Sequence, residues 1–369
     1  MTLADSFNLK RNAIAFLRPA LSVMVILGHA WELGGFGPDP LKRVAGVALG
    51  VFAVHCFFIV GGFLVAGSFE NSGSWRRYLA NRALRIFPGF WVCLLVTAGL
   101  VLPLARWVTV QAGHAEPAAS LAAHLRYVIA NSLLRINQPT VGGIFSGNVS
   151  VGIVNGSLWS LFPEMLCYTF LAVAGVAGLI GGRRRWLLLS VGVAAWGIYA
   201  ASPQVLAAVA GAAWEPKLWY LLQLNSLLAY FCGGALAWAF RSELPFSPAV
   251  RYAALALAAG VLACDAYRIL GPLVLPFAML ALATLLPWHR FDRHGDVSYG
   301  LYLYHYPIMQ TLCTGSFHFA APVTIFGVTL AATLPMAWLS WVLVERPALS
   351  LKRKTLHAVP DANPPHRRS

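Results

Sequence analysis

Charged residues are scarce in this sequence of 369 residues. Asp, Glu, Lys and Arg together make up 11% of it, whereas 59% of the residues are hydrophobic. Several apolar runs are about 20 residues long, which is the length that a helix needs to cross a lipid bilayer. The composition therefore excludes an ordinary soluble protein and indicates an integral membrane protein.

The sequence also has no paired cysteine motif. Its six cysteines stand singly in apolar segments, without a CxxC pair and without the Cys/His spacing of a metal site. We therefore expect buried, reduced thiols and no bound metal. The six are Cys56, Cys93, Cys167, Cys232, Cys264 and Cys313.

Three further features are missing: a cleavable signal peptide, an internal repeat and an attached soluble domain. The first apolar run follows Lys10, Arg11 and Arg18 and has no cleavage site of small residues. We therefore expect it to be retained as the first membrane helix.

Ten apolar runs are present, and thirteen Trp and twelve Tyr suit the aromatic belts of a membrane protein. The sequence predicts an all-α, polytopic fold in which Pro203 ends the fifth span, and Asp265 with Arg268 ends the seventh. The predicted spans are 13–33, 44–67, 87–107, 158–180, 186–203, 218–240, 250–266, 271–288, 297–315 and 321–344.

The basic residues indicate the orientation of these spans. With the N-terminus in the cytoplasm, the inner segments hold 20 of the 27 Lys and Arg residues. Cytoplasmic loops are enriched in these residues, so we expect both termini to be cytoplasmic. This asymmetry accounts for most of the net charge of +14, so binding to nucleic acid is not needed to explain it. We also expect the basic loops to contact anionic lipid headgroups.

Two segments are expected outside the helical core of the predicted domain, residues 11–348. Residues 108–157 form the longest outer loop, with a short amphipathic helix around 118–136. The tail, residues 349–369, is basic and contains proline, which predicts a disordered cytoplasmic segment.

Ionisable side chains inside the apolar runs are the main functional signal, because such groups are costly in lipid and usually mark a reaction site or a pathway. By helical rise, His29 lies roughly 24 Å above the inner end of its span, and Glu164 roughly 9 Å below the outer surface. In a core about 30 Å thick the two levels nearly coincide. They could form a hydrogen-bonded acid–base pair, or each could bond a backbone carbonyl or a hydroxyl instead.

Arginines on the cytoplasmic side form a second group. Arg82 and Arg85 are three residues apart, hence on one helical face. Arg18 lies eleven residues, about three turns, before His29, so both project from broadly the same face. Guanidinium groups bind phosphates well, which predicts an anionic ligand entering from the cytoplasm. Taken one at a time, Arg82 and Arg85 also fit the ordinary basic loops of the inner side, whereas Arg18 lies inside the first span.

The segment 296–308, DVSYGLYLYHYPI, is a third group. Asp296 and Ser298 stand where a helix is expected to begin, so they could cap its free amides or could belong to the site. Tyr299 and further tyrosines then give this helix a hydroxyl-rich face. His305 lies near the predicted midplane and is a weaker candidate than His29.

Together these segments resemble the acyltransferase-3 family of integral membrane acyltransferases, over residues 11–350. The resemblance rests on FLRPALSVMVILGHA, FFIVGGFLVAGSF, RRYLANRALRIFPGFW, GSLWSLFPEMLCYTF, VSYGLYLYHYPI and VERP. The family pattern Arg-x10-His corresponds to Arg18 and His29, and Arg-x-x-Arg to Arg82 and Arg85. The family's tryptophan-containing motif corresponds to Ser157, Leu158, Trp159 and Glu164.

The chain departs from the family pattern at three points. Where members often have an acidic residue and Ser-Gly-Phe in the second helix, it has His55 and Gly61-Gly62-Phe63. Where they often have two acids after the tryptophan motif, it has Glu164-Met165. Many relatives also carry an SGNH hydrolase-like domain, which is not visible here, so a separate periplasmic partner would have to supply that step where it is needed.

The resemblance implies an O-acyltransferase of the bacterial inner membrane. It would move an acyl group, usually acetyl from acetyl-CoA, to a hydroxyl of an envelope or extracellular glycan or a lipid-linked saccharide. His29 and Glu164 would be catalytic, Arg18, Arg82 and Arg85 would bind the donor, and Trp159, Asp296, Ser298, Tyr299 and His305 are secondary candidates. The alternatives are a proton-coupled transporter, which predicts two homologous halves, and a glycan-export component.

Overall fold

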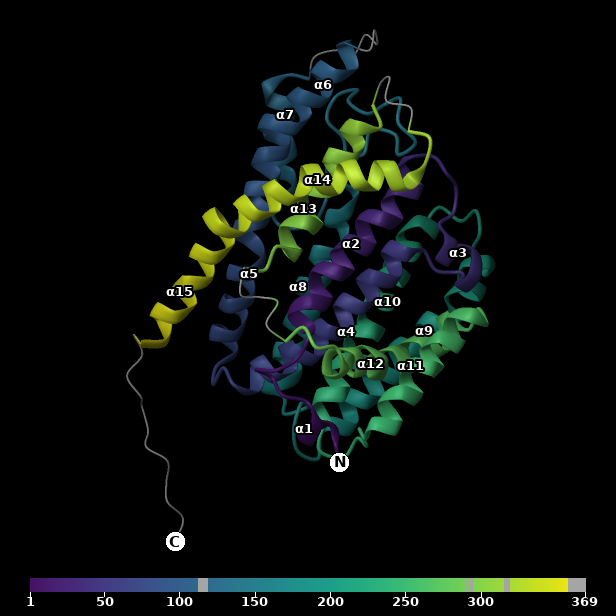
Figure 1. The fold of residues 1–369 in the computed structure, drawn as a ribbon, viewed down its shortest axis with the longest axis vertical. Coiled ribbons are helices and arrows are strands. Elements are labelled where there is room, and N and C mark those ends of the chain that lie inside the picture. The colour runs from purple at the N-terminus through teal and green to yellow at the C-terminus, as the bar shows by residue number, and fades with distance from the viewer. Residues whose placement is uncertain (112–118, 290, 292–294, 315–318, 358–369) are drawn as a thin grey trace.

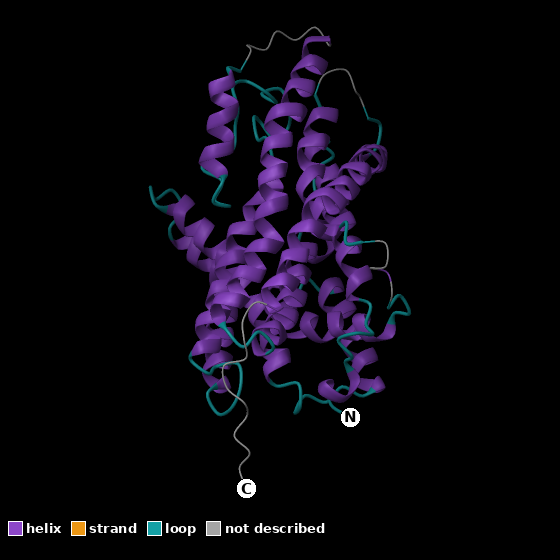
Figure 2. Cartoon of the chain, turned by 90° about the vertical axis from the view of Figure 1, so that its left-hand side faces the viewer, coloured by secondary structure: helices purple, strands orange, loops and turns teal. Residues whose placement is uncertain are grey.

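The computed structural model describes residues 1–111, 119–289, 291, 295–314 and 319–357. Within these residues the fold is all-α, as predicted, and holds no strand (Figures 1 and 2). The helices, including the π- and 3-10 segments named η, are α1 (Leu3–Ser6), α2 (Ile14–Leu33), α3 (Pro40–Ala45), α4 (Leu49–Glu70), α5 (Trp75–Val96), η1 (Thr97–Val101), α6 (Leu102–Gln111), α7 (Leu121–Asn131), η2 (Gly156–Ser160), α8 (Leu161–Val176), α9 (Arg185–Ala208), α10 (Glu215–Ala239), α11 (Pro248–Ala263), α12 (Tyr267–Leu285), α13 (Ser298–Leu312), α14 (Pro322–Ser340), η4 (Trp341–Glu345) and α15 (Arg346–His357).

Eight helical stretches in the described residues are long and apolar enough to cross a membrane. Two further predicted spans correspond to shorter helices, α11 with 16 residues and α13 with 15. The third span is longer than predicted, because α5, η1 and α6 form one continuous helical stretch from Trp75 to Gln111. The predicted amphipathic helix around 118–136 corresponds to α7.

Pro203 does not end the fifth span, as the sequence suggested, because α9 continues to Ala208. A proline removes the amide that would bond the carbonyl one turn earlier. Here that carbonyl belongs to Tyr199, and the Ser202 hydroxyl donates to it over 2.7 Å. The free acceptor is thus satisfied locally, so the helix passes through the proline.

The last helical stretch also differs from prediction. Residues 349–357, which we expected to be disordered, continue in α15 after η4, and this helix extends away from the body of the protein (Figure 1). The remainder of the predicted tail, residues 358–369, lies outside the described residues.

Helix α4 lies at the centre of the bundle and packs against α2, α8, α10 and α12. Its contact with α10 is close enough for the two backbones to touch. A methyl group added at Gly62 would lie 2.1 Å from the Phe231 carbonyl oxygen, and one at Gly234 would lie 1.9 Å from that of Ile59. Any larger residue at either position would force the two helices apart.

All six cysteines are free. Four of them are buried, as expected, in α4, α5, α8 and α10. Cys264 is exposed and Cys313 is half-buried, so for these two the expectation of burial was wrong. Cys264 follows the last residue of α11, where the chain leaves the packed interior.

Candidate active site

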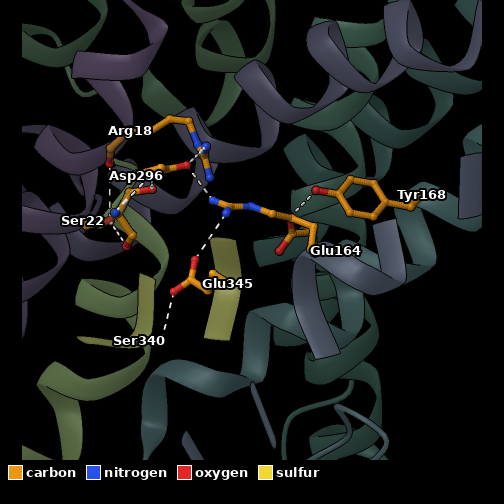
Figure 3. A network of polar contacts seen from close by, with 9 residues as sticks. Arg18, Ser22, Glu164, Tyr168, Asp296, Ser340 and Glu345 are labelled. Carbon is orange, nitrogen blue, oxygen red and sulfur yellow. Dashed lines mark hydrogen bonds and ion pairs between the residues drawn. The ribbon is translucent and has the colours of Figure 1, made fainter. Parts of the chain in front are cut away.

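A network of ion pairs joins four segments at the end of the bundle where α2 begins. The Asp296 carboxylate, just before α13, accepts Arg18 of α2 and, at 2.7 Å, Arg85 of α5 (Figure 3). Arg85 also pairs with Glu345 of η4 at 3.3 Å, and the Ser340 hydroxyl donates to Glu345 at 3.0 Å. Charges that share partners in this way hold α2, α5, η4 and the start of α13 in fixed positions.

Asp296 has a second role at the start of α13. Its other carboxylate oxygen accepts the Ser298 amide at 3.2 Å and the Ser298 hydroxyl, so the predicted capping is present. Burial alone would raise the pKa of Asp296, but Arg18, Arg85 and the bonds from Ser298 outweigh it and hold the pKa well below its ordinary value. The carboxylate is therefore ionised at neutral pH and keeps both arginines in place.

Arg82 differs from the other two arginines. One terminal nitrogen lies 3.4 Å from the Ser68 hydroxyl, and its guanidinium lies 5.9 Å from the centre of the Tyr168 ring. Among the described residues it has no ion pair, and its buried Nε has no hydrogen-bond partner. Its charge and donors are thus available to a ligand.

The three arginines line one cavity of about 340 Å³, here called the arginine cavity. Glu164 and Tyr168 of α8 and Tyr299 of α13 form part of its wall, and apolar residues of α4 form another part. The predicted grouping of Arg18, Arg82 and Arg85 is therefore present in the structure. Its mixed lining suits a ligand with an anionic end and a less polar extension.

Glu164 lies in the arginine cavity, and its partner is the Tyr168 hydroxyl, one turn along α8 (Figure 3). The predicted hydrogen-bonded pair of His29 and Glu164 is not formed. Depth along a helix gives the level of a residue but not its direction around the axis. In addition, the helical segment that carries Glu164 begins at Gly156, in a 3-10 turn with a rise of about 2 Å per residue, which places the carboxylate deeper than estimated.

His29 instead pairs with His305, which the sequence ranked lower. His29 Nδ1 lies 2.9 Å from His305 Nε2, and the two rings are nearly parallel at 19°. His305 Nδ1 lies 2.9 Å from the Leu301 carbonyl, and the Ser157 hydroxyl lies 3.1 Å from His305 Nε2. Helices α2 and α13 and the segment η2 thus supply one connected group.

These contacts fix the tautomers of the neutral pair. A carbonyl can only accept, so His305 Nδ1 carries the hydrogen and its Nε2 must accept. His29 then donates from Nδ1, which leaves a lone pair on His29 Nε2. His305 is fully buried, whereas His29 is half-buried. His29 is therefore the member of the pair that can meet a substrate, with its basic nitrogen free.

Hydroxyl groups lead from the arginine cavity to the histidine pair. Tyr302 and Ser160 both line the cavity, and their oxygens lie 2.6 Å apart. The Tyr302 hydroxyl donates to the carbonyl of Ser157 at 2.8 Å, and the Ser157 side chain contacts His305. The two groups that the sequence treated separately are thus joined through η2 and α13.

The remaining candidates have structural contacts. Tyr299 donates to the Ile86 carbonyl at 2.8 Å, and Arg85 lies over its ring at 5.6 Å. Trp159 is half-buried and packs against the hydrophobic core. Sequence reasoning gave no role to Glu345 or Tyr168. An acid in the last apolar run was the available signal for Glu345.

Comparison with known proteins identifies the family. The acyltransferase domain of the acyltransferase-3 type matches residues 11–344. Nodulation protein 10 of Rhizobium leguminosarum bv. viciae is 29% identical over 93% of this chain and 94% of its own length. An O-acetyl transferase of Shigella phage Sf6 is 29% identical over 91% of this chain and 96% of its own length. No solved structure matches the chain. The family match covers nearly the whole chain, and the described residues hold eight helical stretches that could cross a membrane. This chain therefore belongs to the acyltransferase-3 family of membrane O-acyltransferases.

Proposed function

We propose that the protein transfers an acyl group, most simply acetyl, from cytoplasmic acyl-CoA to a hydroxyl of an envelope or extracellular glycan, in the bacterial inner membrane. The observation that carries the proposal is a chain of hydrogen bonds that connects the arginine cavity to the His29–His305 pair. It runs through Ser160, Tyr302 and Ser157. The relative named as an O-acetyl transferase supports the acetyl donor.

The arginine cavity suits the phosphate end of a coenzyme A donor. Arg82 has free donors, and Arg18 and Arg85 keep further N–H groups beside their bonds to Asp296. Arg18 and His29 are about 16 Å apart along α2. A long flexible thioester arm could follow the apolar wall from α4 and bring its carbonyl towards the histidine pair.

His29 would act as the general base. The acceptor hydroxyl gives its proton to His29 Nε2, its oxygen bonds to the thioester carbonyl carbon, and the carbon–sulfur bond breaks to release the coenzyme A thiolate, which then takes up a proton. His305 accepts from His29 Nδ1 and so stabilises the imidazolium that forms. Attack by His29 itself, with an acyl-histidine intermediate, uses the same free nitrogen.

Labelled acetyl-CoA tests the proposal in membranes that contain the protein. We expect label to enter a saccharide fraction and to be released by mild base, as an O-acetyl ester is. Membranes with His29→Ala, matched for protein amount, should give no such label, while an Arg76→Gln control should behave like the wild type because Arg76 is exposed and does not line the cavity. Equal labelling with His29→Ala would contradict the proposal.

A further inference from the structure

A second cavity, of about 610 Å³, lies outside the proposed reaction site. Four separate regions line it: α3 with its link to the first two turns of α4, the last turns of α9, the first half of α10, and the turn between α11 and α12 with the first turn of α12. With the predicted orientation all four lie at the outer side of the membrane. The volume is in the range of about 300–1,000 Å³ that small-molecule sites occupy. We call it the outer cavity.

Helix α4 separates the outer cavity from the proposed reaction site. Val51 and His55, one turn apart, line the outer cavity, whereas Val54 lines the arginine cavity. Gly50 approaches α2 where Gly28 precedes His29: a methyl group added at Gly28 would lie 2.7 Å from the Gly50 amide nitrogen. Successive residues point about 100° apart, so two adjacent faces of one helix serve two different cavities.

Aromatic groups with polar atoms form one wall of the outer cavity. His55 is 2% exposed and lies 2.8 Å from the Tyr267 hydroxyl, and Tyr199 lies beside them. Trp219 stands at the cavity with about half of its surface exposed. Rings of this kind pack against the C–H faces of a ligand and still offer N–H and O–H groups at their edges.

Charged and amide side chains form the rest of the lining. Arg268 donates to the Ser202 hydroxyl at 2.8 Å and lies over the Tyr199 ring at 5.1 Å. Lys42 and Asp265 also line the cavity, and so does Gln223. Among the described residues none of these charges is in an ion pair. Two cations against one carboxylate favour a ligand with negative charge.

We propose that the outer cavity binds an acidic saccharide, with sugar rings against its aromatic wall and a carboxylate against Arg268 and Lys42. An acyl chain of a lipid would leave the charges and amides without partners, which is costly. A saccharide satisfies both kinds of lining at once. Resting on the proposed function, the cavity would hold a part of the acceptor glycan other than the hydroxyl that reacts.

Filling the cavity gives a direct test on the full-length protein in nanodiscs. Ala200 lines the outer cavity, whereas Ala201, the next residue of α9, is exposed and does not. Ala200→Trp should weaken binding of trigalacturonate at least tenfold in calorimetry, and Ala201→Trp should leave it unchanged. Arg268→Gln should weaken it similarly, with exposed Arg184→Gln as its control, and neutral maltotriose should bind the wild type at least tenfold less tightly.

The possible results distinguish failure of the saccharide site, failure of its preference for acidic sugars, and failure of the proposed function. Absence of trigalacturonate binding to the wild type, or equal binding by Ala200→Trp and Ala201→Trp, would overturn the outer cavity as a saccharide site. Equal binding of maltotriose would overturn its preference for acidic sugars. Incorporation of label from acetyl-CoA into the saccharide fraction of membranes is measured in parallel. If the wild type incorporates no label but binds trigalacturonate in the cavity, the proposed function fails and the binding site stands.

Discussion

At the scale of single residues, the pairing of two histidines changes how each is understood. A histidine such as His29 is costly in lipid, and its contact with His305 gives one of its two ring nitrogens a hydrogen-bond partner. The Leu301 carbonyl decides which nitrogen of His305 carries the hydrogen and thereby which nitrogen of His29 is free. A backbone carbonyl thus sets the basic atom of the proposed reaction through two rings.

Removing either histidine should have different effects. His29→Ala should reduce transfer by at least the 10²–10⁴-fold that a general base contributes, while donor binding persists. His305→Phe should lower kcat less, because the base remains but its tautomer is no longer fixed, and KM for the donor should not change. Steady-state kinetics on protein matched by thermal stability checks both. Normal turnover of His29→Ala would place the reaction elsewhere.

Substitutions of two arginines of the cavity, Arg82 and Arg85, should affect donor binding and thermal stability differently. Arg82→Gln should weaken the binding of coenzyme A by about 1.5–3 kcal/mol, the contribution of a charged hydrogen bond. Its melting temperature should be unchanged, because Arg82 has no ion pair among the described residues. Arg85→Gln should lower the melting temperature as well, since it leaves Asp296 and Glu345 without this partner.

Calorimetry and thermal unfolding measure these two quantities, with Arg76→Gln of the same helix as the control. If Arg82→Gln bound coenzyme A like the control, the cavity would not be the phosphate site.

At the scale of elements, Asp296 is the point where α2, α5 and α13 are held together. Asp296→Asn removes the charge but keeps the size, so we expect a lower melting temperature at neutral pH. Because the pKa of Asp296 is depressed by folding, its stabilisation is complete above the ordinary pKa of about 3.9 and is lost as the pH falls towards the lower folded value.

The difference in melting temperature between wild type and Asp296→Asn should therefore be constant from about pH 5 to 8 and shrink only below about pH 4. Thermal unfolding in nanodiscs across this range measures it. A difference that already shrinks between pH 8 and 6 would show that another group titrates here.

The sequence predicted the elements better than their ends. Apolar runs are a direct consequence of a lipid environment, so the fold class and the position of each span could be inferred. The end of α9 could not, because the Ser202 hydroxyl compensates for Pro203 only in the folded helix. The partner of His29 could not either, since helical rise gives depth alone and His305 approaches from a helix distant in sequence.

At the scale of the whole molecule, the predicted orientation places the arginine cavity towards the cytoplasm and the outer cavity at the outer side of the membrane. Cys264 is exposed beside the turn that lines the outer cavity, so a membrane-impermeant maleimide should label it in spheroplasts of intact inner membrane. In a variant without the other cysteines, Cys264→Ala combined with Arg183→Cys should be labelled only after the membrane is opened. The reverse pattern would invert both cavities.

The ion pairs of the arginine cavity have a consequence for the kinetics of encounter. Three formal positive charges, Arg18, Arg82 and Arg85, stand with three acids, Glu164, Asp296 and Glu345, in one neighbourhood. Ion pairs hold Arg18 and Arg85 against Asp296 and Glu345, whereas Arg82 has no ion pair among the described residues. Charges separated by more than a Debye length of about 8 Å are largely screened in physiological salt. The excess of basic residues in the predicted inner segments, rather than the cavity, would attract an anionic donor from afar, so its association rate should fall as the ionic strength rises. The cavity would then discriminate between anionic ligands by their residence time, which depends on contacts with the unpaired Arg82 once the ligand has bound.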